Sequence, residues 1–135
     1  MKRRKMLGVV IADNGNGIIE RVRQLIEGDP NIEFLGSTID LSSTIQLIQQ
    51  KRPEVVIMDI NIGEDTSGNG VMKLLITIRL QFPDIIIIVL SNSIHSRLNC
   101  IAYGADYFFD KSYDFAIIPD TLKDIHLSLS ASESN

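Results

Sequence analysis

The sequence contains no tryptophan and one cysteine, Cys100. A single cysteine excludes an internal disulfide and is typical of a protein kept in a reducing cytoplasm, which is the location we expect. We expect Cys100 to be a small buried apolar residue rather than a nucleophile. No apolar run approaches the roughly 20 residues that a membrane-spanning helix needs, so we expect no membrane partner.

Excess positive charge is also absent, because the formal net charge of the 135 residues is −4. This balance argues against a general nucleic-acid-binding protein, whose domain is usually basic on one face. The only basic cluster is Lys2–Lys5, and the apolar stretch after it reaches Asp13 without a signal-peptide cleavage site. We expect a basic arm at residues 1–5, one domain at 6–129 and a polar tail at 130–135.

Short continuous apolar runs alternate with segments of helical periodicity along the chain. The runs are rich in Ile and Val and show no polar alternation, which is typical of strands buried on both faces of a parallel sheet. They lie at 7–12, 32–35, 55–58, 85–90 and 107–109, and the helical segments at 18–26, 41–48, 71–78, 94–103 and from Pro119 onward. Five consecutive βα units predict a single doubly wound α/β domain.

Ligands of doubly wound sheets bind outside the carboxyl ends of the strands, so the residues that end each strand are candidate site residues. The predicted strand ends carry three acids, two hydroxyls, an amide and a lysine. In chain order these ends are Asp13–Asn14, Thr38 with Asp40, Asp59, Ser91 and Lys111. An aspartate directly after a buried strand is costly unless it is paired, which favours a functional carboxylate pocket around Asp59.

Two glycine-rich segments suggest phosphate-binding loops but match neither known pattern. Gly15-x-Gly17 is followed by Glu20 where a dinucleotide fingerprint has its third glycine, and Asp13 would repel a pyrophosphate. Residues 63–70 lack the Lys-Ser/Thr pair of a P-loop. Neither histidine, His95 or His126, has a partner at metal-ligand spacing, so we expect surface or capping roles for both. A nucleotide- or flavin-binding protein remains a minor alternative.

The segments VVIADN, VVIMDI, IIIIVLSNS and GADYFFDKS together resemble the receiver domain of bacterial two-component response regulators, over residues 6–127. The resemblance implies a flavodoxin-like fold with a parallel five-stranded sheet of order 2-1-3-4-5. It also implies a phosphoprotein of phosphorelay signal transduction rather than an enzyme, with at most slow self-dephosphorylation.

The resemblance assigns roles to individual residues. Asp59 matches the aspartate that accepts a phosphoryl group, and Ser91 and Lys111 match the hydroxyl and lysine that contact it. Phe108 falls at the aromatic switch position. The implied cofactor is Mg²⁺, held by Asp13, Asp59, Asn14 and the backbone carbonyl of Asn61. Asn14 departs from the family, which usually has a second acid there; the loop after Asp59 is longer than usual, and Ser112 replaces a common proline.

The sequence therefore predicts a stand-alone receiver that takes its phosphoryl group from a sensor histidine kinase or phosphotransfer protein. Its expected output is a contact with a downstream protein through the face formed by the fourth helix, fifth strand and fifth helix, with no nucleic acid involved. The alternative is a non-phosphorylated pseudo-receiver that acts as a protein-interaction module. The sequence favours neither monomer nor oligomer.

Overall fold

The computed structural model describes residues 6–13, 17–62, 69–92, 94–111 and 115–134. Strands and helices alternate along the chain, as the sequence predicts. The strands are β1 (Leu7–Ala12), β2 (Ile32–Thr38), β3 (Val55–Asp59), β4 (Ile86–Ser91) and β5 (Tyr107–Asp110). The helices are α1 (Ile18–Ile26), α2 (Leu41–Lys51), α3 (Asn69–Gln81), α4 (Arg97–Ala102) and α5 (Ile118–Ser134).

The five strands form one parallel sheet in the order β2-β1-β3-β4-β5, which confirms the predicted flavodoxin-like topology. The order reverses between β1 and β3, so the two strands that carry Asp13 and Asp59 at their ends are neighbours. This is the switch point at which doubly wound sheets bind ligands.

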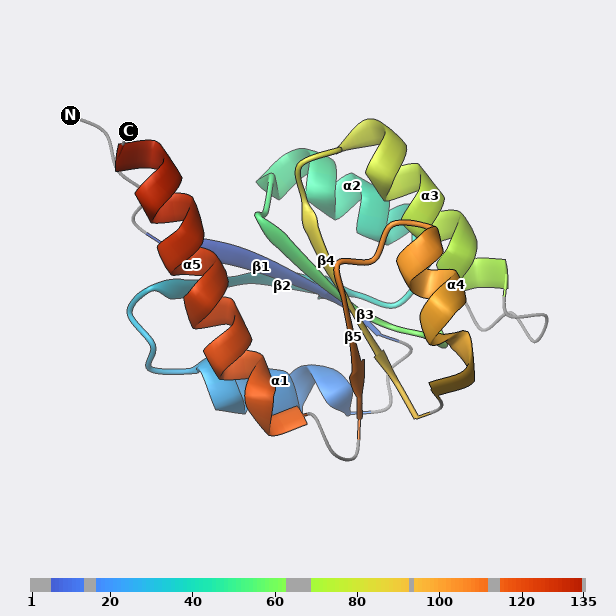
Figure 1. Cartoon of the computed structure of the whole chain (residues 1–135), viewed down its shortest axis with the longest axis horizontal. Helices are drawn as coiled ribbons and strands as arrows, with labels where there is room; N and C mark the ends of the chain where they lie inside the picture. The colour runs from blue at the N-terminus through green and yellow to red at the C-terminus, as the bar shows by residue number, and fades with distance from the viewer. Residues whose placement is uncertain (1–5, 14–16, 63–68, 93, 112–114, 135) are drawn as a thin grey trace.

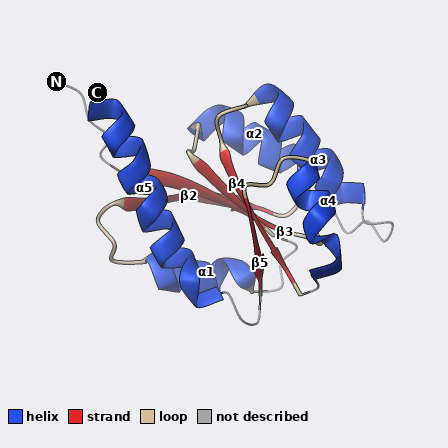
Figure 2. Ribbon diagram, viewed as in Figure 1, coloured by secondary structure: helices blue, strands red, loops and turns tan. Residues whose placement is uncertain are grey.

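Helices cover both faces of the sheet (Figures 1 and 2): α2, α3 and α4 pack on one face, and α1 and α5 on the other. Side chains of alternate strand residues enter the two resulting cores, as Val56 and Ile57 of β3 show. Every residue of β1 and β3 is buried, which explains why their sequences lack polar alternation. The two central strands therefore give the site at their ends a rigid base.

The bounds of the fourth and fifth helices differ from those predicted from the sequence. The fourth helical segment divides into a 3₁₀ turn at Ile94–Ser96 and the short α4. The fifth helix continues to Ser134, so residues 130–134, which we expected to form a tail, are helical. No helix among the described residues has the length and apolar character required to cross a bilayer.

The structure also tests the predictions made for Cys100 and His126. Cys100 is fully buried in α4, as predicted. His126 is buried on α5, and its Nε2 atom has no hydrogen-bond partner among the described residues, so the predicted surface or capping role is wrong. His126 follows Leu122 by four residues and precedes Leu129 by three, which places it on the apolar stripe of the helix.

Candidate phosphoacceptor site

The carboxylates of Asp13 and Asp59 are both fully buried, although each directly follows or ends a strand. Ala12 of β1 is paired with Met58 of β3, so Asp13 and Asp59 are the next residues of adjacent strands. Neighbouring strands lie about 4.8 Å apart, which brings these two acids to one point of the sheet edge.

The ammonium group of Lys111 neutralises Asp59. Its Nζ atom lies 2.9 Å from Asp59 Oδ1, and the lysine side chain is 8% exposed. The backbone N–H of Asn61 donates to the same oxygen at 2.9 Å. Burial removes water from this ion pair, so its attraction is screened less than that of a surface pair. The two donors together fix the orientation of the Asp59 carboxylate.

Asp13 is held by the first turn of α1. The backbone N–H of Ile19 donates to Asp13 Oδ2 at 3.1 Å, and the N–H of Asp13 donates to the Thr38 carbonyl at 2.9 Å. An acid at a helix N-terminus is favoured by the exposed N–H groups and the helix dipole. Asp13 is thereby fixed between β2 and α1.

Ser91 ends β4, the strand that lies between β3 and β5. Its side chain is 2% exposed, and its carbonyl accepts a hydrogen bond from the backbone N–H of Lys111 at 2.9 Å. The same residue thus contributes a buried hydroxyl to the site edge and fixes the backbone from which Lys111 extends. The described structure brings Asp13, Asp59, Ser91 and Lys111 to the carboxyl ends of adjoining strands, as the sequence suggested.

Phe108 lies on β5 opposite Val89 of β4, and its half-buried side chain packs against the core beneath α2, α3 and α4. Tyr107 and Phe109 point to the other face, and their ring centroids are 5.7 Å apart. Phe108 therefore reaches from the strand next to the site toward the α4 side of the sheet.

Thr38 and Asp40 end the second strand but do not join the acidic pair. Asp40 is an exposed N-cap of α2, and its Oδ1 accepts from the Ser43 N–H at 2.7 Å. Hydrogen bonds from the Ser43 hydroxyl and from the Ser43 amide lower the pKa of the Asp40 carboxyl. The Thr38 hydroxyl bonds that of Thr44 at 2.6 Å. Asp40 thus caps α2, and Thr38 ties β2 to that helix. Among the described contacts of these two residues, the Thr38 carbonyl alone reaches a site residue, Asp13.

Carboxylate oxygens are the ligands that Mg²⁺ prefers, and Asp13 and Asp59 supply two buried ones, so the described residues fit this ion. No group of three His, Cys, Asp or Glu side chains suited to a metal occurs in the described part of the chain. Asn14, the loop residues 63–68 and Ser112 lie outside the described residues. Mg²⁺ commonly keeps several waters and one or two carboxylates, so two acids are compatible with its chemistry.

The sequence profile of the response regulator receiver domain matches residues 9–123, and the chain belongs to this family. Receiver domains of two-component systems accept phosphoryl groups and generally bind Mg²⁺ at an acidic site. The family thus accounts for a pair of buried acids and a lysine at the end of a parallel sheet.

Individual relatives share this domain at low identity. The chain is 25% identical over 109 residues to a protein-glutamate methylesterase/protein-glutamine glutaminase of Photobacterium profundum, covering 78% of the chain and 27% of that protein. The isolated receiver domain of RcsB from Salmonella enterica, solved with the phosphomimetic BeF₃⁻, has a TM-score of 0.76 and 22% identity over 89% of the chain and 88% of that domain.

A longer RcsB structure from Salmonella typhimurium, described in terms of DNA interaction, has a TM-score of 0.78 at 21% identity, covering 92% of this chain and 61% of that one. The chain therefore spans about a quarter of the methylesterase and less than two thirds of the longer RcsB chain. At these identities the structural likeness establishes the shared fold.

Proposed function

We propose that the domain acts in the cytoplasm and accepts a phosphoryl group on Asp59 from a sensor histidine kinase or phosphotransfer protein. The observation that carries this proposal is the buried ion pair between Asp59 and Lys111 at the carboxyl edge of a receiver-family sheet. A buried aspartate oriented by an ammonium group and a backbone N–H is suited to act as a nucleophile beside a charge-stabilising group.

In the proposed reaction an oxygen of the Asp59 carboxylate attacks the phosphorus of a phosphohistidine on the donor protein. The P–N bond breaks, its electron pair stays on the imidazole nitrogen, and that nitrogen takes up a proton. The product is an acyl phosphate on Asp59. Lys111 and the Ser91 hydroxyl would contact the phosphoryl oxygens, whose negative charge must be stabilised during transfer.

Asp13, Asp59, the Asn14 side chain and the Asn61 carbonyl would hold Mg²⁺ in this proposal. When bound, the ion supplies positive charge that offsets repulsion between the Asp59 carboxylate and the incoming phosphoryl group. Ile19 and Thr38 contribute by fixing Asp13 through backbone hydrogen bonds. Asn14 offers an amide oxygen without a charge, so we expect weaker metal binding than a second acid would give.

The proposed output is a contact with a downstream protein through α4, β5 and α5, with Phe108 as the switch residue. Leu98 and Ile101 of α4 and Leu127 of α5 expose apolar side chains on these elements, which supports a protein partner. The net charge of −4 favours a protein over nucleic acid. We also predict that the domain acts alone and that it is not an enzyme. The size of the natural gene product in its own cells tests whether the domain acts alone.

The test is incubation with acetyl phosphate and Mg²⁺, followed by intact-mass measurement. We expect one phosphoryl adduct in the wild-type protein and none in Asp59→Asn. Asp84→Asn is the matched control, because it makes the same change at an exposed acid after α3. Loss of the adduct in both variants would contradict the assignment of Asp59.

A folded wild-type protein that gains no adduct at saturating Mg²⁺, with either acetyl phosphate or a phosphorylated kinase, would identify a pseudo-receiver. Such a protein would keep the fold and the interaction face without phosphoryl chemistry. Circular dichroism of the same sample establishes that the protein is folded.

A further inference from the structure

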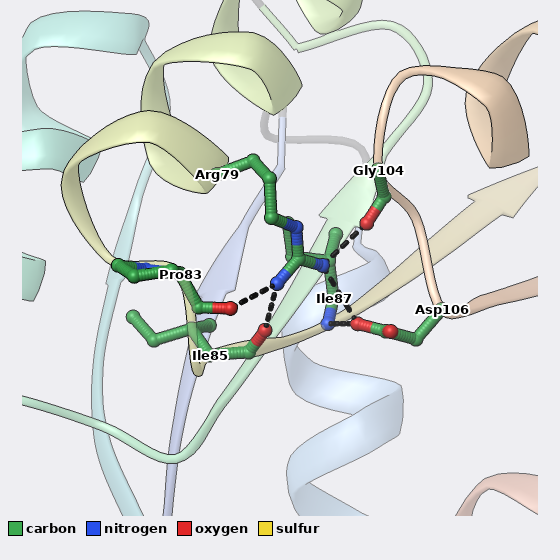
Figure 3. Close-up of polar contacts among 6 residues, drawn as sticks. All are labelled: Arg79, Pro83, Ile85, Ile87, Gly104 and Asp106. Carbon is green, nitrogen blue, oxygen red and sulfur yellow. Dashed lines mark hydrogen bonds and ion pairs between the residues drawn. The ribbon is translucent and has the colours of Figure 1, made fainter.

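Arg79, near the end of α3, makes a set of hydrogen bonds at the edge of the sheet opposite the phosphoacceptor site. Its Nη1 donates to the carbonyls of Pro83 at 2.9 Å and Ile85 at 2.8 Å. Its Nη2 donates to the Gly104 carbonyl and lies 2.9 Å from Asp106 Oδ2 (Figure 3). One guanidinium group therefore joins the segment that enters β4 to the segment that enters β5.

Asp106 extends this set of bonds into the sheet. Its Oδ2 also accepts from the backbone N–H of Ile87 at 2.8 Å, and its own N–H donates to the Ile87 carbonyl at 2.8 Å. Side chain and backbone of Asp106 thus bind the same residue of β4. The register of β5 on β4 is fixed at this point, one residue before β5 begins.

β5 depends on such an anchor more than the other strands do. It is an edge strand of four residues, and within the described part of the chain its one pairing partner is β4. Lys111 follows it directly, and the N–H of Lys111 bonds the Ser91 carbonyl at the other end of the same ladder. Because side chains alternate between the faces of a strand, a shift of one residue would direct Lys111 away from Asp59.

We infer that Arg79 is a positioning residue for the phosphoacceptor site, acting through Asp106 and β5 on Lys111. The inference rests on the proposed function of Asp59. Arg79 and Asp106 are 28% and 42% exposed, so their ion pair alone would contribute little. Arg79 positions β5 through its planar guanidinium group, which bonds the segment before β4 and the segment before β5 at the same time. A lysine ammonium group cannot reproduce that geometry.

The experiment compares Arg79→Ala, Arg79→Lys and Asp106→Asn with the wild-type protein. Arg97→Ala, which removes an exposed arginine of α4, is the matched control, and Ile48→Val reports a loss of core stability on α2. Two quantities are measured at a temperature where circular dichroism shows every variant folded. They are the rate of phosphorylation by acetyl phosphate with Mg²⁺ and the hydrogen-exchange rate of the Lys111 amide.

We expect Arg79→Ala to slow phosphorylation by about 10-fold, because small displacements of positioned groups are costly in rate. Exchange at Lys111 should accelerate, while exchange at the core strand β1 should not. Arg79→Lys and Asp106→Asn should lie between Arg79→Ala and wild type, and both controls should match wild type.

Wild-type phosphorylation and wild-type exchange at Lys111 in folded Arg79→Ala would overturn the inference, as would equal slowing in Ile48→Val. If Arg79→Ala does not fold, Arg79→Lys and Asp106→Asn are judged by the same two criteria. If the wild-type protein is not phosphorylated, the proposed function fails, and the Lys111 exchange rate alone decides whether Arg79 controls the position of that residue.

Discussion

The ion pair between Lys111 and Asp59, in which Nζ lies 2.9 Å from Oδ1, crosses β4, a strand that contains neither residue. Asp59 ends β3, Lys111 follows β5, and β4 lies between the two in the sheet. The lysine side chain therefore spans the end of β4, where Ser91 lies. This arrangement connects three strand ends through one long side chain and makes the pair sensitive to the register of β5.

Lys111→Met should destabilise the protein by about 3 kcal/mol, because it leaves Asp59 buried without its ammonium partner. The double variant Asp59→Asn/Lys111→Met should recover most of that loss, since the uncompensated charge is removed as well. Urea unfolding of both single variants and the double variant gives the coupling free energy. Additive losses would show that the ion pair is energetically unimportant.

Mg²⁺ should raise the unfolding temperature of the wild-type protein, because a ligand that binds only the folded state stabilises it. At a concentration 100 times the dissociation constant the gain is about 2.7 kcal/mol. Asp13→Asn should gain much less, since it removes one of the two buried carboxylates. Asp84→Asn, which removes an exposed charge, should respond like the wild type. An equal gain in Asp13→Asn would contradict the placement of the metal site.

Asn14→Asp should tighten Mg²⁺ binding if residue 14 is a ligand. A further carboxylate charge about 4 Å from a divalent ion is worth about 2 kcal/mol even at the dielectric constant of water, or about 30-fold in affinity. Isothermal titration of wild-type protein and variant measures the change. Unchanged affinity would remove Asn14 from the proposed ligand set and leave Asp13 and Asp59 as its acids.

The sheet could be predicted from the sequence because its strands are buried on both faces. β1 begins and ends at the predicted residues, and the strand ends supplied Asp13, Asp59, Ser91 and Lys111 as candidates. Local apolar runs carry this information. The fourth helix was less predictable: Leu98 and Ile101 are exposed rather than part of an apolar stripe, so periodicity gave only a weak signal.

The interactions that position the site could not be predicted in the same way. Arg79 donates to three backbone carbonyls. Every residue has a backbone carbonyl, so the residue types in the sequence do not reveal which ones accept these hydrogen bonds. Its side-chain partner, Asp106, is 27 residues away. The GAD segment gave a family resemblance but no physical reason for its residues. The structure supplies one, since Gly104 and Asp106 are both partners of Arg79.

Gly104→Ala should destabilise the protein more than Gly28→Ala. Both glycines have positive φ angles, 122° and 89°, so an alanine is strained at each by about 1 kcal/mol or more. A Cβ atom at Gly104 would also lie 3.2 Å from Arg79 Nε, whereas a Cβ at Gly28 meets nothing within 4 Å. Thermal or urea unfolding of both variants measures the added cost at Gly104 of its larger φ angle and of crowding Arg79. Equal losses would show that Arg79 moves aside at no cost.

Burial raises the pKa of the Cys100 thiol to about 11 from an ordinary value of 9.0. The unfolded chain therefore loses this proton first, and between these values it binds fewer protons than the folded state. Stability should fall as the pH rises from about 9 to about 11, and the thiol should react slowly with a disulfide reagent near pH 8 until the protein unfolds. The comparison is urea unfolding of wild-type protein and Cys100→Ala across this pH range, because other titrating groups cancel in the difference. A difference that stays constant from about pH 8 to about pH 11 would mean that the thiol ionises equally in both states, and thus that water reaches Cys100 in the folded protein.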